Sequence, residues 1–281
     1  MRFGITFGQL NPKGWLDAVV EADRLGFESA WLPEHLVFPV EMHGQLVPGE
    51  EHPPVPPSTP VYEPGAYLSF VAARTERIRL GTFVYLLGIR HPFVGARTFA
   101  TLDVVSGGRA EVGVGAGWMT SEWEAVGLDP RTRGRRLDEA VEVCRRLWTE
   151  ETVEHHGEFF DFPPVMFEPK PIQDPHPPVV VGGESDRALR RAARNDGWIG
   201  MAHTPESVRP QVERLRKLEA DEDRGERPPV TVTVMGEVTS TADVAAWEDA
   251  GVDRLIVVPW TSSREAVDGL RRFADAFLTW H

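Results

Sequence analysis

The stretch from residue 77 to residue 116, RIRLGTFVYLLGIRHPFVGARTFATLDVVSGGRAEVGVGA, decides the fold. It opens with a β-branched and apolar run, residues 77–84, which predicts a strand. Residues 93–104 come directly after Pro92 and predict a helix, because a proline at a helix start removes an N–H that has no partner there. A second apolar run, residues 109–116, predicts another strand. Strand, helix and strand in this order indicate a parallel βαβ unit.

The same alternation of a short apolar run with a longer amphipathic stretch continues in both directions from this unit. It gives eight strand-and-helix pairs in all. The pairs are residues 2–7 with 15–26, 28–33 with 63–75, 77–84 with 93–104, 109–116 with 133–149, 178–182 with 185–195, 197–201 with 205–220, 229–234 with 241–250, and 254–258 with 263–279. Eight such units in a chain of this length predict an α/β fold, a single (β/α)8 or TIM barrel domain over residues 1–281.

Two Pro-rich insertions interrupt the repeat. The first follows strand two and holds seven prolines between residues 48 and 64, and the second, residues 150–178, follows helix four and holds seven more. Because proline cannot continue a helix, we expect both insertions to be irregular loops. In a barrel they would cover or rim the end that carries the active site, and we expect residues 36–62 to determine substrate choice.

Composition and charge exclude several classes of function. The chain has 281 residues, of which 41% are hydrophobic, and its 30 Lys and Arg against 43 Asp and Glu give a formal net charge of −13. Such a charge repels phosphate backbones and anionic membrane surfaces. No run approaches the roughly 20 apolar residues of a membrane-spanning helix, and the N-terminal apolar run is too short for a signal peptide. We therefore expect a cytoplasmic protein that binds neither nucleic acid nor membranes.

The end of strand two holds the first candidate for catalysis. In a barrel, chemistry lies where strands end and helices begin. Strand two ends with Glu34 and His35, which places a carboxylate and an imidazole together at the barrel mouth. An imidazole there can donate or accept a proton near neutral pH. From position alone, His35 could equally be an exposed loop residue.

Two glycine-rich strand ends offer contacts to a ligand. Strand four ends with residues 113–118, GVGAGW, whose alternating glycines allow a ligand close to the backbone, although GxGxG is not the dinucleotide fingerprint. Strand five ends with Gly182 and Gly183, and Ser185 follows at a helix N-terminus, which favours an anion such as a phosphate. Ser185 could instead serve only as the N-cap of that helix.

Metal and covalent chemistry lack support in the sequence. No HExxH, HxH or paired CxxC spacing occurs, and the adjacent His155 and His156 would point apart on a strand. The single cysteine, Cys144, falls on the apolar stripe of a helix, and no GxSxG is present. We therefore expect no metal site and no covalent nucleophile.

Several separated segments share one pattern of residues. They are residues 26–35 (GFESAWLPEH), 77–82 (RIRLGT) with 90–92 (RHP), 102–109 (LDVVSGGR) with 113–118 (GVGAGW), 133–139 (RGRRLDE), 147–148 (LW), and 181–183 (VGG) with 196–198 (DGW). As an ordered set over about residues 1–200, they resemble the luciferase-like monooxygenase superfamily. Within it they resemble the oxidoreductases that use the deazaflavin coenzyme F420.

The resemblance implies a (β/α)8 barrel whose cofactor ring lies at the strand ends, against a bulge of strand three with a non-prolyl cis peptide. The cis bond would map to Phe83 and Val84, and His35 would approach the ring as the catalytic residue. The cofactor contacts that the resemblance implies are Thr82, Phe83 and Val84 on the bulge, Ala116 and Gly117 after strand four, and Gly182, Gly183 and Ser185 around the phosphate. Family members are commonly homodimers, so we expect a homodimer here.

One position departs from the family pattern. Sugar-phosphate dehydrogenases of this superfamily place a proton-donating glutamate after the strand-four glycines, where this chain has Trp118. A sugar phosphate is therefore doubtful as the substrate, and we expect an apolar or aromatic molecule stacked on Trp118, with Glu34 also beside it. Glu34, Glu122 and Tyr85 are further candidates for supplying a proton, and spacing does not choose among them.

The resulting hypothesis is an F420-dependent oxidoreductase that transfers a hydride between the deazaflavin and a small-molecule substrate, with His35 assisting proton movement. F420 and FMN share the ring face and the first phosphate, so these contacts do not separate them. If the cofactor is FMN, the alternative is a monooxygenase that works with a separate flavin reductase. A further alternative is a barrel that binds a flavin or fatty ligand without turnover.

Overall fold

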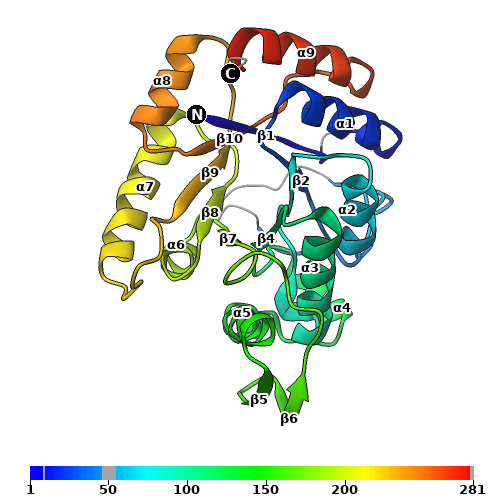
Figure 1. The fold of residues 1–281 in the computed structure, drawn as a ribbon, viewed down its shortest axis with the longest axis vertical. Helices are drawn as coiled ribbons and strands as arrows, with labels where there is room; N and C mark the ends of the chain where they lie inside the picture. Colours follow the sequence, from blue (N-terminus) through cyan, green and yellow to red (C-terminus); the bar gives the residue numbers. More distant parts are fainter. Residues whose placement is uncertain (9, 46–54, 279–281) are drawn as a thin grey trace.

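A closed barrel of eight parallel strands forms the centre of the protein, and helices surround it (Figure 1). The computed structural model describes residues 1–8, 10–45 and 55–278. Around the barrel the strands follow the order β1, β10, β9, β8, β7, β4, β3, β2, and β2 pairs with β1 to close it. The predicted (β/α)8 barrel is confirmed.

The elements follow one another in the expected alternation. The barrel strands are β1 (Arg2–Thr6), β2 (Ser29–Leu32), β3 (Arg79–Thr82), β4 (Ala110–Val114), β7 (Val179–Gly182), β8 (Gly197–Gly200), β9 (Thr231–Met235) and β10 (Arg254–Val257). The helices are α1 (Trp15–Leu25), α2 (Pro64–Ala72), α3 (Pro92–Ser106), α4 (Thr120–Ala125), α5 (Arg133–Thr149), α6 (Asp186–Ala193), α7 (Pro205–Ala220), α8 (Thr241–Asp249) and α9 (Ala266–Phe277). Local sequence sets several ends: Gly26 closes α1 in the left-handed conformation, and Thr204 and Ser240 open α7 and α8 with capping boxes.

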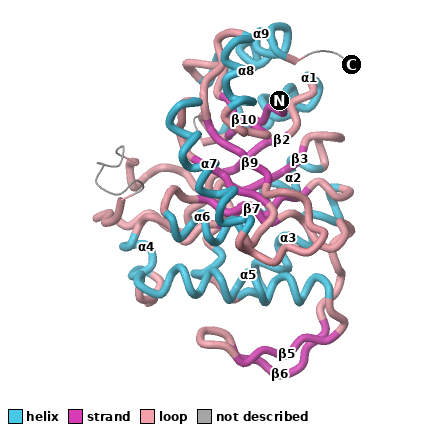
Figure 2. The backbone as a smooth tube through the Cα atoms, turned by 90° about the vertical axis from the view of Figure 1, so that its left-hand side faces the viewer, coloured by secondary structure: helices cyan, strands magenta, loops and turns pink. Residues whose placement is uncertain are grey.

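The second Pro-rich insertion differs from the expectation. Residues 150–178 were expected to be irregular, but they contain an antiparallel hairpin of β5 (Thr152–His156) and β6 (Asp161–Met166). Pro163 and Pro164 are tolerated in β6 because this sheet has only two strands, so β6 has a free edge, and because the register shifts in the middle of the pairing. Figures 1 and 2 place the hairpin beyond α5, on the outside of the helix layer.

Smaller differences lie near the ends of elements. The short helix α4, between β4 and α5, was not expected. The described parts of the first insertion, residues 33–45 and 55–63, form neither helix nor strand, as expected, while residues 46–54 and the expected helix end at Thr279 lie outside the described residues. No helix of the described chain is both long enough and apolar enough to cross a membrane.

Trp31 fills the middle of the barrel. Its side chain is fully buried, and its Nε1 donates to Oγ of Ser29 at 2.9 Å. Glycines on nearby strands leave room for the indole: a Cβ would lie 2.5 Å from the Trp31 ring at Gly81, 3.2 Å from Nε1 at Gly4, and 3.4 Å from the ring at Gly113. A larger residue on any of these three strands would compete with Trp31 for the interior.

An apolar layer connects Trp31 with the barrel mouth. The buried members of this cluster are Trp31, Val180, Ile199 and Ile256, and Phe83, Val84 and Met235 pack against it. Apolar side chains therefore fill the barrel from Trp31 to its mouth, where Phe83 and Val84 follow β3 and Met235 ends β9.

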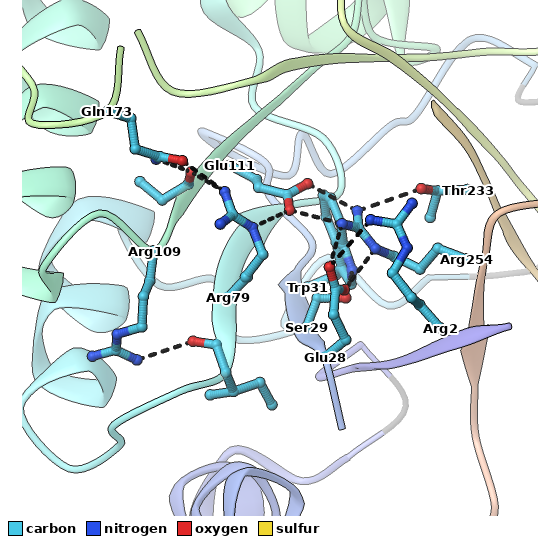
Figure 3. A network of polar contacts seen from close by, with 12 residues as sticks. Arg2, Glu28, Ser29, Trp31, Arg79, Arg109, Glu111, Gln173, Thr233 and Arg254 are labelled. Atoms are coloured by element: carbon cyan, nitrogen blue, oxygen red, sulfur yellow. Dashed lines mark hydrogen bonds and ion pairs between the residues drawn. The ribbon is translucent and has the colours of Figure 1, made fainter. Parts of the chain in front are cut away.

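A buried ion-pair network closes the amino end of the barrel (Figure 3). Glu111 of β4 lies between Arg79 of β3 and Arg254 of β10. Arg254 donates two hydrogen bonds of 2.8 Å to the Glu111 carboxylate and one of 2.7 Å to Glu28. In the strand order, three strands separate β4 from β10 in either direction. The Glu111–Arg254 pair therefore spans the width of the barrel.

The two arginines keep Glu111 ionised. Burial by itself would raise the pKa of Glu111, but the charges and hydrogen bonds of Arg254 and Arg79 outweigh burial, so the pKa lies below its ordinary value. Burial works in the opposite direction on Arg254, yet Glu111 and Glu28 raise the pKa of its guanidinium. The network is therefore charged at neutral pH, and each member depends on its partners.

We predict that Glu111→Gln lowers the free energy of unfolding at pH 7 by about 3–5 kcal/mol, because two guanidiniums lose their buried counter-charge. The depressed pKa of Glu111 means that its stabilising contribution is present above the ordinary carboxyl pKa. That contribution is lost as the pH falls through the lower, folded-state value. The difference between wild type and variant should therefore shrink on acidification, as measured by urea unfolding at several pH values.

The control for this experiment is Asp129→Asn, which breaks an exposed pair with Arg131. It should unfold like the wild type, because exposed ion pairs contribute little. Equal stability of Glu111→Gln and the wild type at pH 7 would contradict the role given to the network.

Candidate active site

His35 follows β2, and a buried carboxylate holds its imidazole. Nδ1 of His35 lies 2.8 Å from Oε2 of Glu122; the Glu122 side chain is 1% exposed and the His35 side chain 19%. The second oxygen of Glu122 accepts the backbone N–H groups of Leu36 at 2.6 Å and Val37 at 3.3 Å. Because a carboxylate only accepts hydrogen bonds, Nδ1 is the donor in this pair. Nε2, which has no partner among the described residues, is left to exchange a proton with a ligand.

The start of α4 also holds the segment that follows β2. The N–H of Thr120 donates to the carbonyl of His43 at 2.7 Å, and Oγ of Ser121 accepts the N–H of His43 at 3.0 Å. Gly44 adopts φ 131°, and a Cβ there would lie 2.1 Å from the carbonyl oxygen of Trp118. This close approach requires glycine, so α4 fixes both ends of the segment between His35 and Gly44.

The chain leaves the barrel wall as a bulge after β3. The peptide bond between Phe83 and Val84 is cis, which confirms what the resemblance implies. The N–H of Phe83 still donates to the carbonyl of Leu32 at 2.8 Å, and pairing with β4 resumes where the N–H of Tyr85 donates to Gly113 at 2.7 Å. The bulge at Phe83 and Val84 is therefore held between two backbone hydrogen bonds to the neighbouring strands of the barrel.

The Val84 side chain packs directly on glycine backbone. A Cβ at Gly115 would lie 2.3 Å from one Val84 methyl group, and a Cβ at Gly182 would lie 2.6 Å from the other. Ala116 and Gly117 follow on the same side of the barrel, both half-buried, and Gly117 has φ 77°. The ends of β3, β4 and β7 are neighbours. Together they form an apolar surface of one half-buried valine packed on glycine backbone.

The residues expected around a phosphate lie at the start of α6. Oγ of Ser185 accepts the N–H of Ala188 at 3.2 Å, so its role as N-cap is confirmed. Gly183 has φ 123°, which favours glycine, and its carbonyl accepts the indole N–H of Trp198 at 2.9 Å. Anion binding at this helix start stays a prediction.

A second histidine–carboxylate pair follows β8. Nε2 of His203 lies 3.0 Å from Oε2 of Glu184, and its Nδ1 lies 3.1 Å from Oγ of Ser207. The other oxygen of Glu184 accepts the N–H of Met201 at 2.7 Å. Three strands separate β8 from β2 in either direction. The two pairs therefore stand on opposite sides of the mouth.

Two of the candidate proton donors are occupied elsewhere. Glu34 is buried and accepts hydrogen bonds from the N–H of Leu86 and from Arg90; burial raises the pKa of its carboxyl, although Arg90 opposes the shift. Tyr85 is also buried, and burial raises its pKa to about 12. Of the three candidates, only Glu122 contacts the imidazole at the mouth.

Thr82 and Trp118 have different surroundings. Thr82 is fully buried, and its hydroxyl donates to the carbonyl of Gly113 at 2.7 Å, so the hydroxyl connects β3 with β4. Trp118 is half-buried and meets the His35 ring edge to face, with 5.9 Å between ring centroids. The centroid of the Phe38 ring lies 4.6 Å from the centroid of the same imidazole. His35 thus lies beside two aromatic side chains.

The sequence did not reveal how Glu122 acts. The residue was one of three candidates, and no spacing connects it with His35, which lies 87 residues earlier. The polar residues that open α4 could have indicated a helix start after strand four. Within the parts of the chain that the structure describes, no group of three or more His, Cys, Asp and Glu side chains is arranged to hold a metal ion.

Comparisons with known proteins relate this arrangement to one family. A family model described as luciferase-like monooxygenase matches residues 4–276. Two proteins of Mycobacterium tuberculosis, both described as uncharacterized, are 31% and 34% identical over 272 and 257 residues. The matches cover 93% and 90% of this chain and 91% and 90% of theirs. An FMNH(2)-dependent dimethylsulfone monooxygenase of Pseudomonas putida is 33% identical over 148 residues, which is 51% of this chain and 40% of that protein.

Solved structures have the same fold. The monooxygenase RslO1 from Streptomyces bottropensis superposes with a TM-score of 0.78 at 23% identity and covers 99% of both chains. An F420-dependent secondary alcohol dehydrogenase, solved with an F420–acetone adduct, superposes with a TM-score of 0.77 at 16% identity and covers 99% of this chain and 98% of that one.

We predict that Glu122→Gln accelerates amide hydrogen exchange at Leu36 and Val37 by roughly tenfold, because a neutral amide accepts their hydrogen bonds more weakly than a carboxylate. Mass spectrometry of a peptide covering residues 33–45 measures the rate. Glu124→Gln, an exposed position on the same helix, is the matched control and should exchange like the wild type. Unchanged exchange in Glu122→Gln would mean that other contacts hold this segment.

Proposed function

The chain belongs to the luciferase-like monooxygenase family, and we propose that it is an F420-dependent oxidoreductase that transfers a hydride between the deazaflavin and an apolar or aromatic small molecule. The observation that carries the proposal is the pairing of buried Glu122 with His35 at the same barrel mouth as the glycine-lined apolar surface around Val84. Hydride transfer to or from an oxygen-bearing carbon needs a surface that binds the flat cofactor ring and a side chain that moves a proton.

The chain's own residues would bind the cofactor from three strand ends. Val84 and Phe83 would support one face of the ring, and the backbone at Ala116 and Gly117 would contact its edge. The free N–H groups at the start of α6, beside Gly183, would hold a phosphate. When bound, the deazaflavin would supply or accept the hydride.

His35 would move the proton. With Nδ1 held by Glu122, the ring presents Nε2 to a substrate oxygen in a fixed tautomer. When Nε2 accepts a proton, the buried carboxylate stabilises the imidazolium that forms. Trp118 would pack against an apolar or aromatic substrate beside this ring and exclude water.

A second candidate function is an FMN-dependent monooxygenase that receives reduced flavin from a separate reductase. The similarity to a dimethylsulfone monooxygenase that is described as FMNH(2)-dependent favours it. The surface around Val84 suits either cofactor, because F420 and FMN share the ring face and the first phosphate. The homodimer stays a prediction under both candidates.

We predict that the protein binds F420 at least tenfold more tightly than FMN in a fluorescence titration with the oxidised and reduced forms of each. Gly182→Ala should weaken F420 binding, because its Cβ displaces Val84 from a contact of 2.6 Å. Gly14→Ala is the matched control, since the nearest atom to its Cβ is 4.0 Å away. Tight binding of FMN alone would favour the monooxygenase over the F420-dependent enzyme, and binding of neither would overturn the cofactor site.

We further predict that His35→Asn lowers the rate of hydride transfer by roughly 10²–10⁴-fold, while the Kd for F420 changes little, because the proton-transfer group is lost and the ring seat is kept. F420 absorbance with a panel of neutral alcohols and ketones measures the rate. His156→Asn, an exposed position on the β5–β6 hairpin, should behave as the wild type. A wild type that binds F420 but transfers hydride to no acceptor would favour a binding role without turnover.

A further inference from the structure

A buried ion pair lies next to the chain that leaves the bulge at Phe83 and Val84. Glu34 follows β2, directly before His35, and Arg90 comes shortly before α3. Nη2 of Arg90 donates to Oε1 of Glu34, and its Nη1 lies 3.4 Å from Oε2. The two side chains are only 1% and 12% exposed, so removing either partner would leave a buried charge.

The ion pair binds the main chain of Leu86 through both of its polar groups. Oε2 of Glu34 accepts the N–H of Leu86 at 2.8 Å, and Nη1 of Arg90 donates to the Leu86 carbonyl at 3.0 Å. Hydrogen bonds to charged groups are roughly twice as strong as those between neutral groups. Leu86 lies two residues after Val84, so the ion pair fixes the chain where the bulge ends.

The side chain of Leu86 extends the connection to α4. Leu86 is almost completely buried and belongs to one apolar cluster with Trp123 of α4. A Cβ at Gly117 would lie 3.1 Å from a Leu86 methyl group, so this side chain also packs on the backbone after β4. Trp123 is adjacent in sequence to Glu122, whose carboxylate contacts the His35 ring. The contacts that start at the ion pair therefore lead through α4 to the imidazole.

The Arg90 guanidinium interacts with both carboxylates of this region. Burial by itself would lower the pKa of Arg90, but the charge and hydrogen bond of Glu34 raise it above its ordinary value, with contributions in the same direction from Tyr85 and Glu122. The guanidinium therefore stays charged. A lysine in its place would keep the charge, but it lacks the planar group that contacts Glu34 and Leu86 at the same time.

We propose that Glu34 and Arg90 are positioning residues that keep the surface around Val84 aligned with the His35 ring. The inference rests on the proposed function in taking this surface to bind the cofactor ring. Neither side chain touches the reacting atoms, because both act through Leu86 and α4. Transfer between two bound groups depends on their alignment much more steeply than the binding of either group does. Loosening the ion pair should therefore slow the chemical step more than it weakens binding.

The test compares Arg90→Lys with Arg109→Lys. Arg109 lies directly before β4 at the amino end of the barrel, is half-buried like Arg90, and donates to the carbonyls of Ala72 and Ile78. Its substitution removes comparable hydrogen bonds far from the mouth. Arg90→Lys should lower the rate of hydride transfer at saturating F420 by roughly 10–10²-fold and change the Kd for F420 by less than about threefold. Arg109→Lys should keep the wild-type rate, even where urea unfolding shows a loss of stability.

A second measurement uses the full chain without cofactor. Arg90→Lys should accelerate amide exchange in a peptide covering residues 84–90 by roughly tenfold, because Leu86 loses charge-assisted hydrogen bonds. It should also shift the NMR signal of the His35 ring, which is identified by its absence in His35→Asn. Arg109→Lys should do neither. If Arg90→Lys does not fold, Glu34→Gln replaces it, because the amide keeps an acceptor for Leu86 and removes the ion pair.

The outcomes separate this inference from the proposed function. If the wild type binds neither F420 nor FMN, but the His35 signal responds to Arg90→Lys and not to Arg109→Lys, the alignment role stands and the proposed function is wrong. If the wild type transfers hydride and both variants lower the rate equally, the proposed function stands and this inference is wrong. A His35 signal that is unchanged in Arg90→Lys would also overturn the inference.

Discussion

The ion pair between Glu111 and Arg254 is the interaction on which the interior of the barrel depends. It connects two strands that lie opposite each other, and both side chains are almost completely buried. The Arg254 guanidinium also lies over the Trp31 ring, 5.3 Å from its centroid, while Ser29 accepts the Trp31 N–H. Trp31 in turn belongs to the apolar layer that supports Val84. The ion pair at the amino end of the barrel therefore supports the surface around Val84 at the mouth through one aromatic side chain, Trp31.

Carboxylates take different partners at the two ends of the barrel. At the amino end, Glu111 forms ion pairs with two guanidiniums, which never lose their protons under ordinary conditions. At the mouth, Glu122 and Glu184 share their oxygens between backbone N–H groups and an imidazole. Permanent charge pairs stabilise, whereas an imidazole can exchange a proton. The division follows the general separation in TIM barrels between a stabilising amino end and a functional carboxyl end.

Hydrophobic patterning predicted the barrel because each of its eight strand-and-helix pairs had its own local signal, down to caps such as Gly26 and Ser185. The β5–β6 hairpin was missed because Pro163 and Pro164 suggest a loop unless the free edge of a two-stranded sheet is known in advance. Glu111 and Arg254 are 143 residues apart, and the pairing of Glu122 with His35 crosses 87 residues. Such contacts are made by the closed barrel, so one sequence without its fold does not identify them.

The Glu122 carboxylate contacts two groups at once. One oxygen contacts the His35 ring, and the other accepts the backbone N–H groups of Leu36 and Val37. Any opening of this segment that pulls these N–H groups away also disturbs the group that orients the imidazole. Displacement of this segment and orientation of the His35 ring by Glu122 are therefore opposed states of one local equilibrium. Under the proposed function, a molecule that enters by displacing the segment would meet an unoriented histidine, so closure of the segment would precede proton transfer.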